Sequence, residues 1–492
     1  MKKFITIILA LSMVFAMSAF AFDADNNSKL SIPTPDEIES YYQQVSSQAV
    51  TLTAESANIM SVLSENSDIE NQPLLQLGVL SSFAEDQDDL SILIAASPII
   101  IEEIMPNLTA NEYISILSNE KYTSAFKFSI IDMYSYAATS DTTRNTTNFS
   151  SVDEKLKDFV FPNNELSIIA LTSIQDKSII SCEKLTNLFN NGTVSEQQLS
   201  LKVMSEIYPA ATRSYIEDIL SSENENTVLY RTAINFVPSI VQNSDELTES
   251  EALNIIDNIL ANTNDELVKI TCVQALQKLN SAAASAIISS NISTIPVELV
   301  EYYNLHSDFD VIFINTNNIA PRSSTNRLAN AIYRDGVAVI EYHAGIVAHS
   351  QGPEYNSTGK WVIHASGDSS SVVEYAKYKP DFLKDKKPVG EYYMSSMSYS
   401  DQLNIFFTAV DLTNNGITYT LLSIFTTNLS SGTISPSDII KMRCDGVVEY
   451  SYEYNGIKVL GGSTNWNCST VSGLLAHSGT PKSQSQAFNS TY

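Results

Sequence analysis

The chain has 492 residues, of which 43% are hydrophobic, and a formal net charge of −28 at pH 7. The hydrophobic content excludes wholesale disorder, and the negative charge disfavours binding to nucleic-acid phosphates or to anionic lipid. Residues 301–492 contain 13 basic and 17 acidic side chains, so nearly all of the negative charge lies in the first 300 residues. We interpret this charge as a solubilising surface, and an acidic face for a cationic partner is the alternative.

The first residues have the layout of a secretory signal peptide. Two lysines precede an apolar run over residues 4–20, and Ala19-Phe20-Ala21 is a small-x-small cleavage pattern. We expect a signal peptide over 1–21, with a retained membrane anchor as the alternative, and a flexible lead-in over 22–35. No later run is apolar enough for the roughly 20 residues that a membrane span needs. The mature chain is therefore expected to have no transmembrane segment and to be secreted, either extracellular or associated with the cell wall.

Residues 36–300 have the pattern of successive helices, with apolar residues at spacings of three and four and breaks at Asn, Ser and Asp clusters. One helix opens with a predicted capping box of Thr248 and Glu251. The stretches 225–237 and 265–276 align at an offset of 39. A period near 40 resembles HEAT-type repeats. We expect a HEAT-like, solenoid-like all-α domain that offers a concave surface to a protein or polymer partner, with an irregular helical domain as the alternative.

The composition changes after residue 300. Residues 301–324 are interpreted as a connector. The chain beyond them contains β-branched and aromatic runs that predict strands, namely GVAVIEYHAGIVAHS, GKWVIHAS, SSVVEYAKY, QLNIFFTAVDL and GITYTLLSIFTT. A helical pattern follows in SPSDIIKMRCDGVVEYSYEYNG, with Ser435 or Ser437 as its cap and Asn455-Gly456 at its end. We predict a multidomain chain in which an α+β domain over 325–492 follows the all-α domain.

Four cysteines in a chain of this length do not make a disulfide scaffold. Cys182 and Cys272 lie on apolar helical patterns, which are typical places for buried free thiols. Cys444 lies near a predicted helix start, where unpaired N–H groups and the helix dipole favour a thiolate, so it is the candidate nucleophile. Three alternatives stay open: a structural role for Cys444, Cys468 as the nucleophile, and a disulfide between Cys444 and Cys468.

Three of the five histidines lie close together in the sequence, at His343, His349 and His364. His343 and His364 belong to neighbouring predicted strands, and facing residues of antiparallel strands have Cβ atoms about 4.5 to 5.5 Å apart. One imidazole can take a thiol proton while another polar group fixes its tautomer. A structural role for both histidines is the alternative, and His349 and His477 are assigned to a loop and to the surface. Cys-x-x-Cys and His-x-x-x-His spacings are absent, so no metal or cofactor is predicted.

These motifs resemble those of NlpC-type cell-wall cysteine peptidases. HAGIV and WVIHA are similar to the family's His-x-Gly-Ile-Tyr and Val-Ile-His-Ala strand pair, and RCDGVVEYSYE is similar to its Asp-Cys-Ser-Gly-Leu-Val nucleophile helix. Both histidine motifs precede the cysteine here, an order that resembles the circularly permuted branch of the papain-like fold, which includes lecithin:retinol acyltransferase-like proteins. The resemblance covers about residues 325–490. It implies Cys444 as the nucleophile, His343 as the general base and His364 as the residue that orients the base.

The resemblance implies a secreted hydrolase that cleaves amide bonds, most often in peptidoglycan stem peptides, through an acyl-cysteine. An acyltransferase or thioesterase of the permuted type is one alternative, and a non-enzymatic binding or scaffold protein with a vestigial catalytic domain is another. The sequence departs from the family pattern at Arg443, where Asp is usual, and at Asp445, where Ser is usual. Residues 351–360 look like an inserted loop that would reshape the substrate cleft. The Cys444 amide is a generic candidate for the oxyanion hole.

Overall fold

The structure is a computed structural model, and three of the expected segments lie wholly or partly outside the residues that it describes. The signal peptide over 1–21 and the connector over 301–324 lie outside entirely, as does most of the lead-in. The described residues are 30–51, 63, 69, 71–140, 150–221, 227–291, 293–295, 328–335, 342–348, 361–368, 371–392, 397–422, 425–427, 429, 431–460, 466–467 and 480–491.

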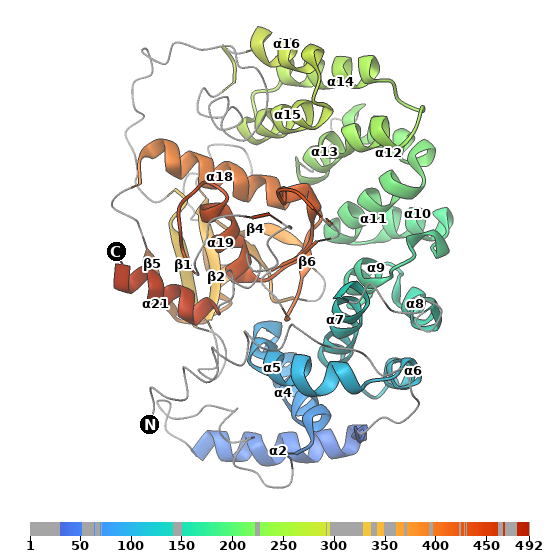
Figure 1. Ribbon diagram of the computed structural model, residues 1–492, viewed down its shortest axis with the longest axis vertical. Coiled ribbons are helices and arrows are strands. Elements are labelled where there is room, and N and C mark those ends of the chain that lie inside the picture. Colours follow the sequence, from blue (N-terminus) through green and yellow to red (C-terminus); the bar gives the residue numbers. More distant parts are fainter. Residues whose placement is uncertain are drawn as a thin grey trace.

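The described chain up to residue 295 is built of helices, as predicted. They follow one another in an arc, with α2 at one end and α16 at the other (Figure 1). The α-helices are α2 (Pro35–Thr51), α4 (Pro73–Gln87), α5 (Ser97–Ile99), α6 (Ala110–Ser118), α7 (Ser124–Ser140), α8 (Ser150–Leu156), α9 (Ser167–Ser173), α10 (Cys182–Asn191), α11 (Val194–Ile207), α12 (Pro209–Ser221), α13 (Thr227–Asn243), α14 (Glu249–Asn262), α15 (Glu266–Leu279) and α16 (Ala282–Ser290). Short 3-10 or π segments are η1 (Leu90–Ala96), η2 (Ile100–Ile104), η3 (Met105–Asn107), η5 (Lys157–Phe159) and η6 (Lys177–Ile179).

The local sequence explains where several of these helices begin. The predicted capping box is present at α14, where the Thr248 side chain accepts from the Glu251 N–H and the Glu251 carboxylate accepts from the Thr248 N–H. The same reciprocal arrangement opens α6, with Thr109 and Glu112. Each box satisfies N–H groups that have no partner inside the helix, so it fixes the first turn.

The two aligned stretches form equivalent helices, α13 and α15, which pack side by side. Their aligned residues Asn235 and Gln274 both face the C-terminal part of the chain. The Asn235 side chain donates to the Asn414 carbonyl at 2.8 Å, and Gln274 donates to the Phe407 carbonyl at 3.5 Å. The two aligned stretches therefore form neighbouring helices, and the HEAT-like solenoid stays a prediction. The surface that these helices form is occupied by the chain's own α18 (Tyr399–Thr413), so an external partner there would have to compete with it (Figure 1).

The C-terminal part combines helices with two sheets, in agreement with the predicted α+β class. The strands of the larger sheet are all antiparallel, in the order β4-β3-β2-β1-β5, and the smaller sheet has the order β6-β8-β7. The strands are β1 (Ala331–Asp335), β2 (Tyr342–Ala348), β3 (Trp361–Ala365), β4 (Val373–Lys377), β5 (Pro388–Tyr392), β6 (Thr418–Tyr419), β7 (Phe425–Thr427) and β8 (Ile439–Met442). The remaining elements are η9 (Tyr378–Leu383), η10 (Pro436–Asp438), α19 (Cys444–Glu453) and α21 (Pro481–Thr491).

Two predictions for this part were wrong. The run QLNIFFTAVDL lies in helix α18, because Ser398 and Asp401 form a capping box ahead of it and the helix is buried on most sides, which hides helical periodicity. The long helix predicted from residue 435 is interrupted. Ser435 caps only the short η10, residues 439–442 form a strand, and helix α19 begins at Cys444.

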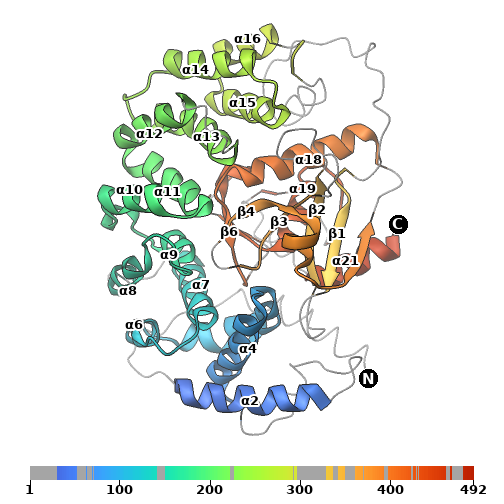
Figure 2. The ribbon, with the colours of Figure 1, turned by 180° about the vertical axis from the view of Figure 1, so that it is seen from behind.

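The two faces of the larger sheet carry different cores. Helix α19 packs on the face that includes Ala344, Ile346 and Ile363, and this face is continuous with the main core of the molecule. The opposite face carries a small separate cluster around Phe382 of η9. Figure 2 shows the sheet enclosed between the helical arc on one side and α21 on the other. The site residues lie on both faces of β2 and β3.

A buried ion pair also links the helical arc to the C-terminal part. Asp132 of α7 lies 3.1 Å from the Lys441 ammonium of β8, and the same carboxylate accepts from the Leu421 N–H at 2.8 Å. Helix α19 begins at Cys444, three residues after Lys441. The helical arc therefore helps to fix the strand that precedes Cys444 and its helix.

Candidate functional site

Cys444 is the first residue of α19 and a free, fully buried thiol. Its position at the helix N-terminus matches the prediction, and the N–H of Ala344 on β2 donates to its sulfur. Burial raises the pKa of the Cys444 thiol to about 12. The neighbouring Asp445 carboxylate adds to that rise, while the Ala344 N–H and Arg443 oppose it. The thiol is therefore protonated at neutral pH in this arrangement.

Arg443 and Asp445, the two departures from the family pattern, are bonded to each other. The Arg443 guanidinium donates to both Asp445 oxygens, from Nε at 2.9 Å and from Nη2 at 2.6 Å, and both side chains are buried. Bidentate pairing of this kind orients both partners. The two residues that flank Cys444 therefore form one ion pair with each other. The family pattern has an acidic residue and a hydroxyl residue at these two positions.

His343 and His364 meet on neighbouring strands, as predicted. Nε2 of His343 lies 2.8 Å from Nδ1 of His364, and the two ring planes are perpendicular. The register between β2 and β3 pairs Ile346 with Ile363, which sets His364 opposite Gly345 and diagonal to His343. Phe382 packs against both rings, with centroid distances of 5.4 Å.

Gly345 makes this close packing possible. A Cβ at this position would lie 2.5 Å from a methyl carbon of Val362 and 3.2 Å from the Phe382 ring. The glycine of the HAGIV motif therefore has a steric role between the two histidines and the ring that covers them.

Both imidazoles are neutral in this environment. Burial, followed by the positive charge of Arg334, lowers the pKa of His364 to about 3, and the same two causes place the pKa of His343 well below its usual value. The outer nitrogens, Nδ1 of His343 and Nε2 of His364, have no hydrogen-bond partner within the described residues. Glu374 of β4 lies across from His364, with its Oε1 at 4.0 Å from Nε2. A neutral imidazole with a free nitrogen can accept a proton.

The structure does not join the cysteine to the histidines. Side chains alternate along a strand, so Ala344 faces α19 while His343 and His364 face Phe382 on the other side of the sheet. Because both outer imidazole nitrogens are unpartnered, neither is hydrogen-bonded to the Cys444 sulfur. The sulfur reaches the strand one residue away from His343, through the Ala344 N–H.

Sequence reasoning missed two residues beside this site, Asp89 and Arg334. Their side chains form a buried ion pair with an N–O distance of 3.0 Å, and Arg334 pairs with His343 in the β1–β2 register. The two residues are 245 positions apart, so no local pattern connects them. Glu374 was also missed, although its place in the predicted strand next to His364 was a usable signal.

The remaining candidates lie outside the described residues. These are Cys468 and His349, which were the rival nucleophile and the rival base, together with His477 and the inserted loop over 351–360. The described residues contain no group of three His, Cys, Asp or Glu side chains arranged to hold a metal ion. Among the described helices, none combines the length and the apolar character that crossing a membrane requires.

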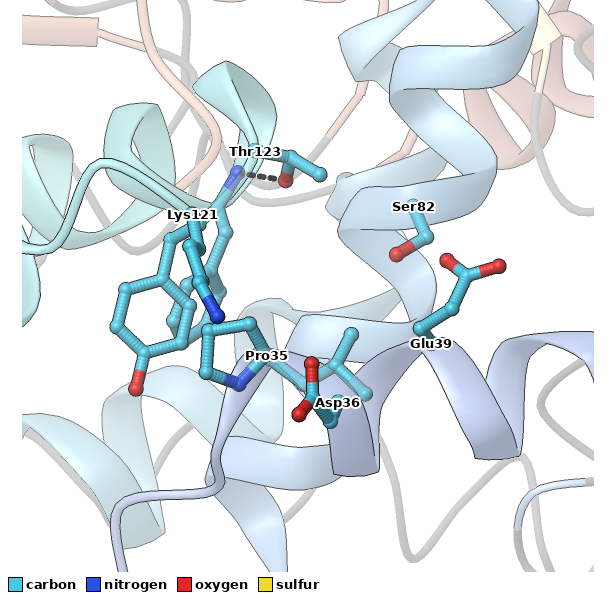
Figure 3. Close-up of a pocket in the computed structure, with 9 residues that line it drawn as sticks. Pro35, Asp36, Glu39, Ser82, Lys121 and Thr123 are labelled. Carbon is cyan, nitrogen blue, oxygen red and sulfur yellow. Dashed lines mark hydrogen bonds between the residues drawn. The ribbon is translucent and has the colours of Figure 1, made fainter.

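A pocket of about 200 Å³ lies elsewhere, in the helical arc (Figure 3). Asp36 and Glu39 of α2, Ser82 of α4 and Lys121 line it, together with Tyr122 and neighbouring apolar side chains. None of the cysteine and histidine candidates contributes to this pocket.

Comparison of the chain with models of protein families, with characterised proteins and with solved structures gives no match.

Proposed function

We propose that the protein is a secreted cysteine hydrolase whose C-terminal part has a permuted papain-like fold and cleaves amide bonds, most often in peptidoglycan stem peptides. One observation carries the proposal. The imidazoles of His343 and His364 lie 2.8 Å apart, and the sulfur of Cys444 accepts a hydrogen bond from the N–H of Ala344, the residue that follows His343 on β2. Cys444 and His343 thus reach adjacent residues of β2 from opposite faces of the sheet, and His364 of β3 contacts His343.

In the proposed reaction His343 takes the proton from the Cys444 sulfur, and the thiolate attacks the carbonyl carbon of the amide. The C–N bond breaks, the protonated His343 gives its proton to the leaving amine, and an acyl-cysteine remains. Water, deprotonated by His343, then attacks the acyl carbon and releases the carboxylic acid and the thiol. His364 holds the His343 ring in place through their hydrogen bond.

Under this proposal, the closed arrangement in the structure is a resting state of the site. With a thiol pKa of about 12, forming the thiolate at pH 7 costs roughly 7 kcal/mol, at about 1.4 kcal/mol per pH unit. Turnover therefore requires a change that brings Cys444 within hydrogen-bond reach of His343 and admits water. Such a change lowers the thiol pKa, because burial is the largest cause of its elevation.

A non-enzymatic binding protein with a vestigial catalytic domain is the second candidate. Its supporting observation is the same closed geometry: a buried thiol, two buried imidazoles and no bond between sulfur and imidazole. In that case the cysteine and histidines serve only as packing.

Digestion of purified muropeptides by the mature protein separates the two candidates. We expect cleavage by the wild type, loss of cleavage in Cys444→Ala, and unchanged cleavage in Cys272→Ala, which removes another buried free thiol, in helix α15. A parallel assay with acyl esters reports acyl transfer or thioesterase activity. Cleavage that survives in Cys444→Ala would contradict the assignment, and no cleavage or acyl transfer by any variant would favour the binding protein.

A further inference from the structure

We propose that residues 87–90, which we call the strap, are an inhibitory element that the helical arc lays over the Cys444–His343–His364 site and that must withdraw before substrate enters. This proposal rests on the proposed function, because it explains why the site is closed. The strap joins the end of α4 to η1, both of which belong to the helical arc.

The central contact of the strap is the ion pair between Asp89 and Arg334. The two side chains are 2% and 3% exposed, and Arg334 also lies over the Phe382 ring, at 5.9 Å from its centroid. Because Arg334 pairs with His343 in the sheet register, the strap reaches the strand position beside the proposed base. A buried ion pair adds little net stability compared with apolar side chains of similar size. Stability of the fold therefore does not by itself explain why a charged pair is buried here.

Three more contacts fasten the strap around the site. The Leu90 N–H donates to the Gly367 carbonyl at 2.8 Å, just beyond the end of β3. The Lys384 ammonium donates to both the carbonyl and the carboxylate of Asp88 at 3.3 Å, and Lys386 donates to Gln87 at 3.5 Å. The strap is thereby tied to the end of the His364 strand and to the segment that follows Phe382.

The charges of this ion pair shift the pKa values of all three proposed site residues. The Asp89 carboxylate raises the pKa of Cys444 and opposes the lowering of the pKa of His364, while Arg334 lowers the pKa of both histidines. The ion pair therefore lies close enough to act electrostatically on the cysteine and on the histidines. Withdrawal of the strap leaves Arg334 without its carboxylate and opens the rim of the sheet to water.

The test is the rate at which iodoacetamide alkylates Cys444 in the folded full-length chain, followed by peptide mass mapping. Asp89→Asn keeps the shape of the side chain and removes its charge. We expect Cys444 to react at least tenfold faster in this variant than in the wild type. Cys272, which is buried in the helical arc, reacts faster only if the whole chain unfolds. It should therefore keep its wild-type alkylation rate in this variant.

A matched control is Asp411→Asn, which removes another buried aspartate that joins the two parts of the chain, through Lys278 at 3.8 Å. It should leave the Cys444 rate unchanged. Should Asp89→Asn fail to fold, Lys384→Ala serves instead, since Lys384 is partly exposed and its loss should still accelerate Cys444 two- to threefold.

Two results would overturn the strap: an unchanged Cys444 rate in folded Asp89→Asn or Lys384→Ala, or Cys444 and Cys272 rates that rise together. The labelling needs no catalysis, so the two proposals fail separately. Faster labelling without muropeptide cleavage by Asp89→Asn supports the strap and contradicts the hydrolase. Muropeptide cleavage by the wild type, together with a Cys444 labelling rate that is the same in the wild type and in both variants, supports the hydrolase and contradicts the strap.

Discussion

The buried pair of Asp132 and Lys441 gives the sharpest stability prediction. Both side chains are at most 2% exposed, and the carboxylate accepts from the Lys441 ammonium at 3.1 Å, from the Leu421 N–H at 2.8 Å and from the Thr420 hydroxyl at 3.0 Å. Among the described residues, Asp132→Ala leaves the lysine with the Ser173 hydroxyl as its partner, and the buried Leu421 N–H loses its acceptor. Removing one member of a buried pair costs roughly 3 to 5 kcal/mol, and the orphaned N–H makes the upper part of that range the expectation.

Urea unfolding at pH 7, followed by tryptophan fluorescence, measures this loss in the free energy of unfolding. The double variant Asp132→Leu, Lys441→Met removes both charges and should recover most of the loss, because no unpaired charge stays buried. A loss below about 1 kcal/mol in Asp132→Ala, or a double variant no more stable than the single one, would refute the reasoning.

Three further predictions concern the site and its support. His364→Gln should reduce the loss of stability on acidification. With its pKa lowered to about 3, His364 stays neutral in the folded chain while its unfolded form takes up a proton below pH 6.5, so it should cost the wild type up to roughly 1.4 kcal/mol per pH unit between pH 6.5 and 4. The contribution of His343, whose pKa is also lowered, should stay in the variant, and identical pH profiles of wild type and variant would contradict this. Gly345→Ala places a Cβ 2.5 Å from a Val362 methyl and 3.0 Å from a carbonyl oxygen, so thermal unfolding should show a loss of about 1 to 3 kcal/mol, whereas an unchanged melting temperature would show that the site is loosely packed. A double-mutant cycle of Asn414→Ala and Thr271→Ala, whose side chains are bonded at 3.2 Å, should give a coupling energy of about 0.5 to 1.5 kcal/mol, and additive losses would argue against that bond.

Much of the fold was accessible from the sequence because its signals are local. Capping at Thr248, the helical spacing of α13 and α15, and the alternation in β2 and β3 all depend on a few neighbouring residues. Helix α18 was mistaken for a strand because a helix buried on most sides loses its polar face, and its Phe, Ile and Val content resembles that of a strand.

The candidate site could be predicted only in part, because only some of its contacts depend on local sequence. The pairing of His343 with His364 follows from the adjacency of their strands, and Cys444 at a helix start follows from local sequence. Alternation puts His343 and Ala344 on opposite faces of the sheet, but the sequence does not say which face α19 covers. The contact of Asp89 with the site depends on how the arc packs, which local patterns do not encode.

The most direct test of the account is mass spectrometry of the protein during incubation with a muropeptide, for the wild type and for Asp89→Asn. We expect an acyl adduct on the peptide that contains Cys444, in greater amount in Asp89→Asn, and none in either background once His343→Ala is added. The absence of any adduct on Cys444 in both proteins, together with intact muropeptide, would contradict the claim that this cysteine and these histidines form a catalytic site.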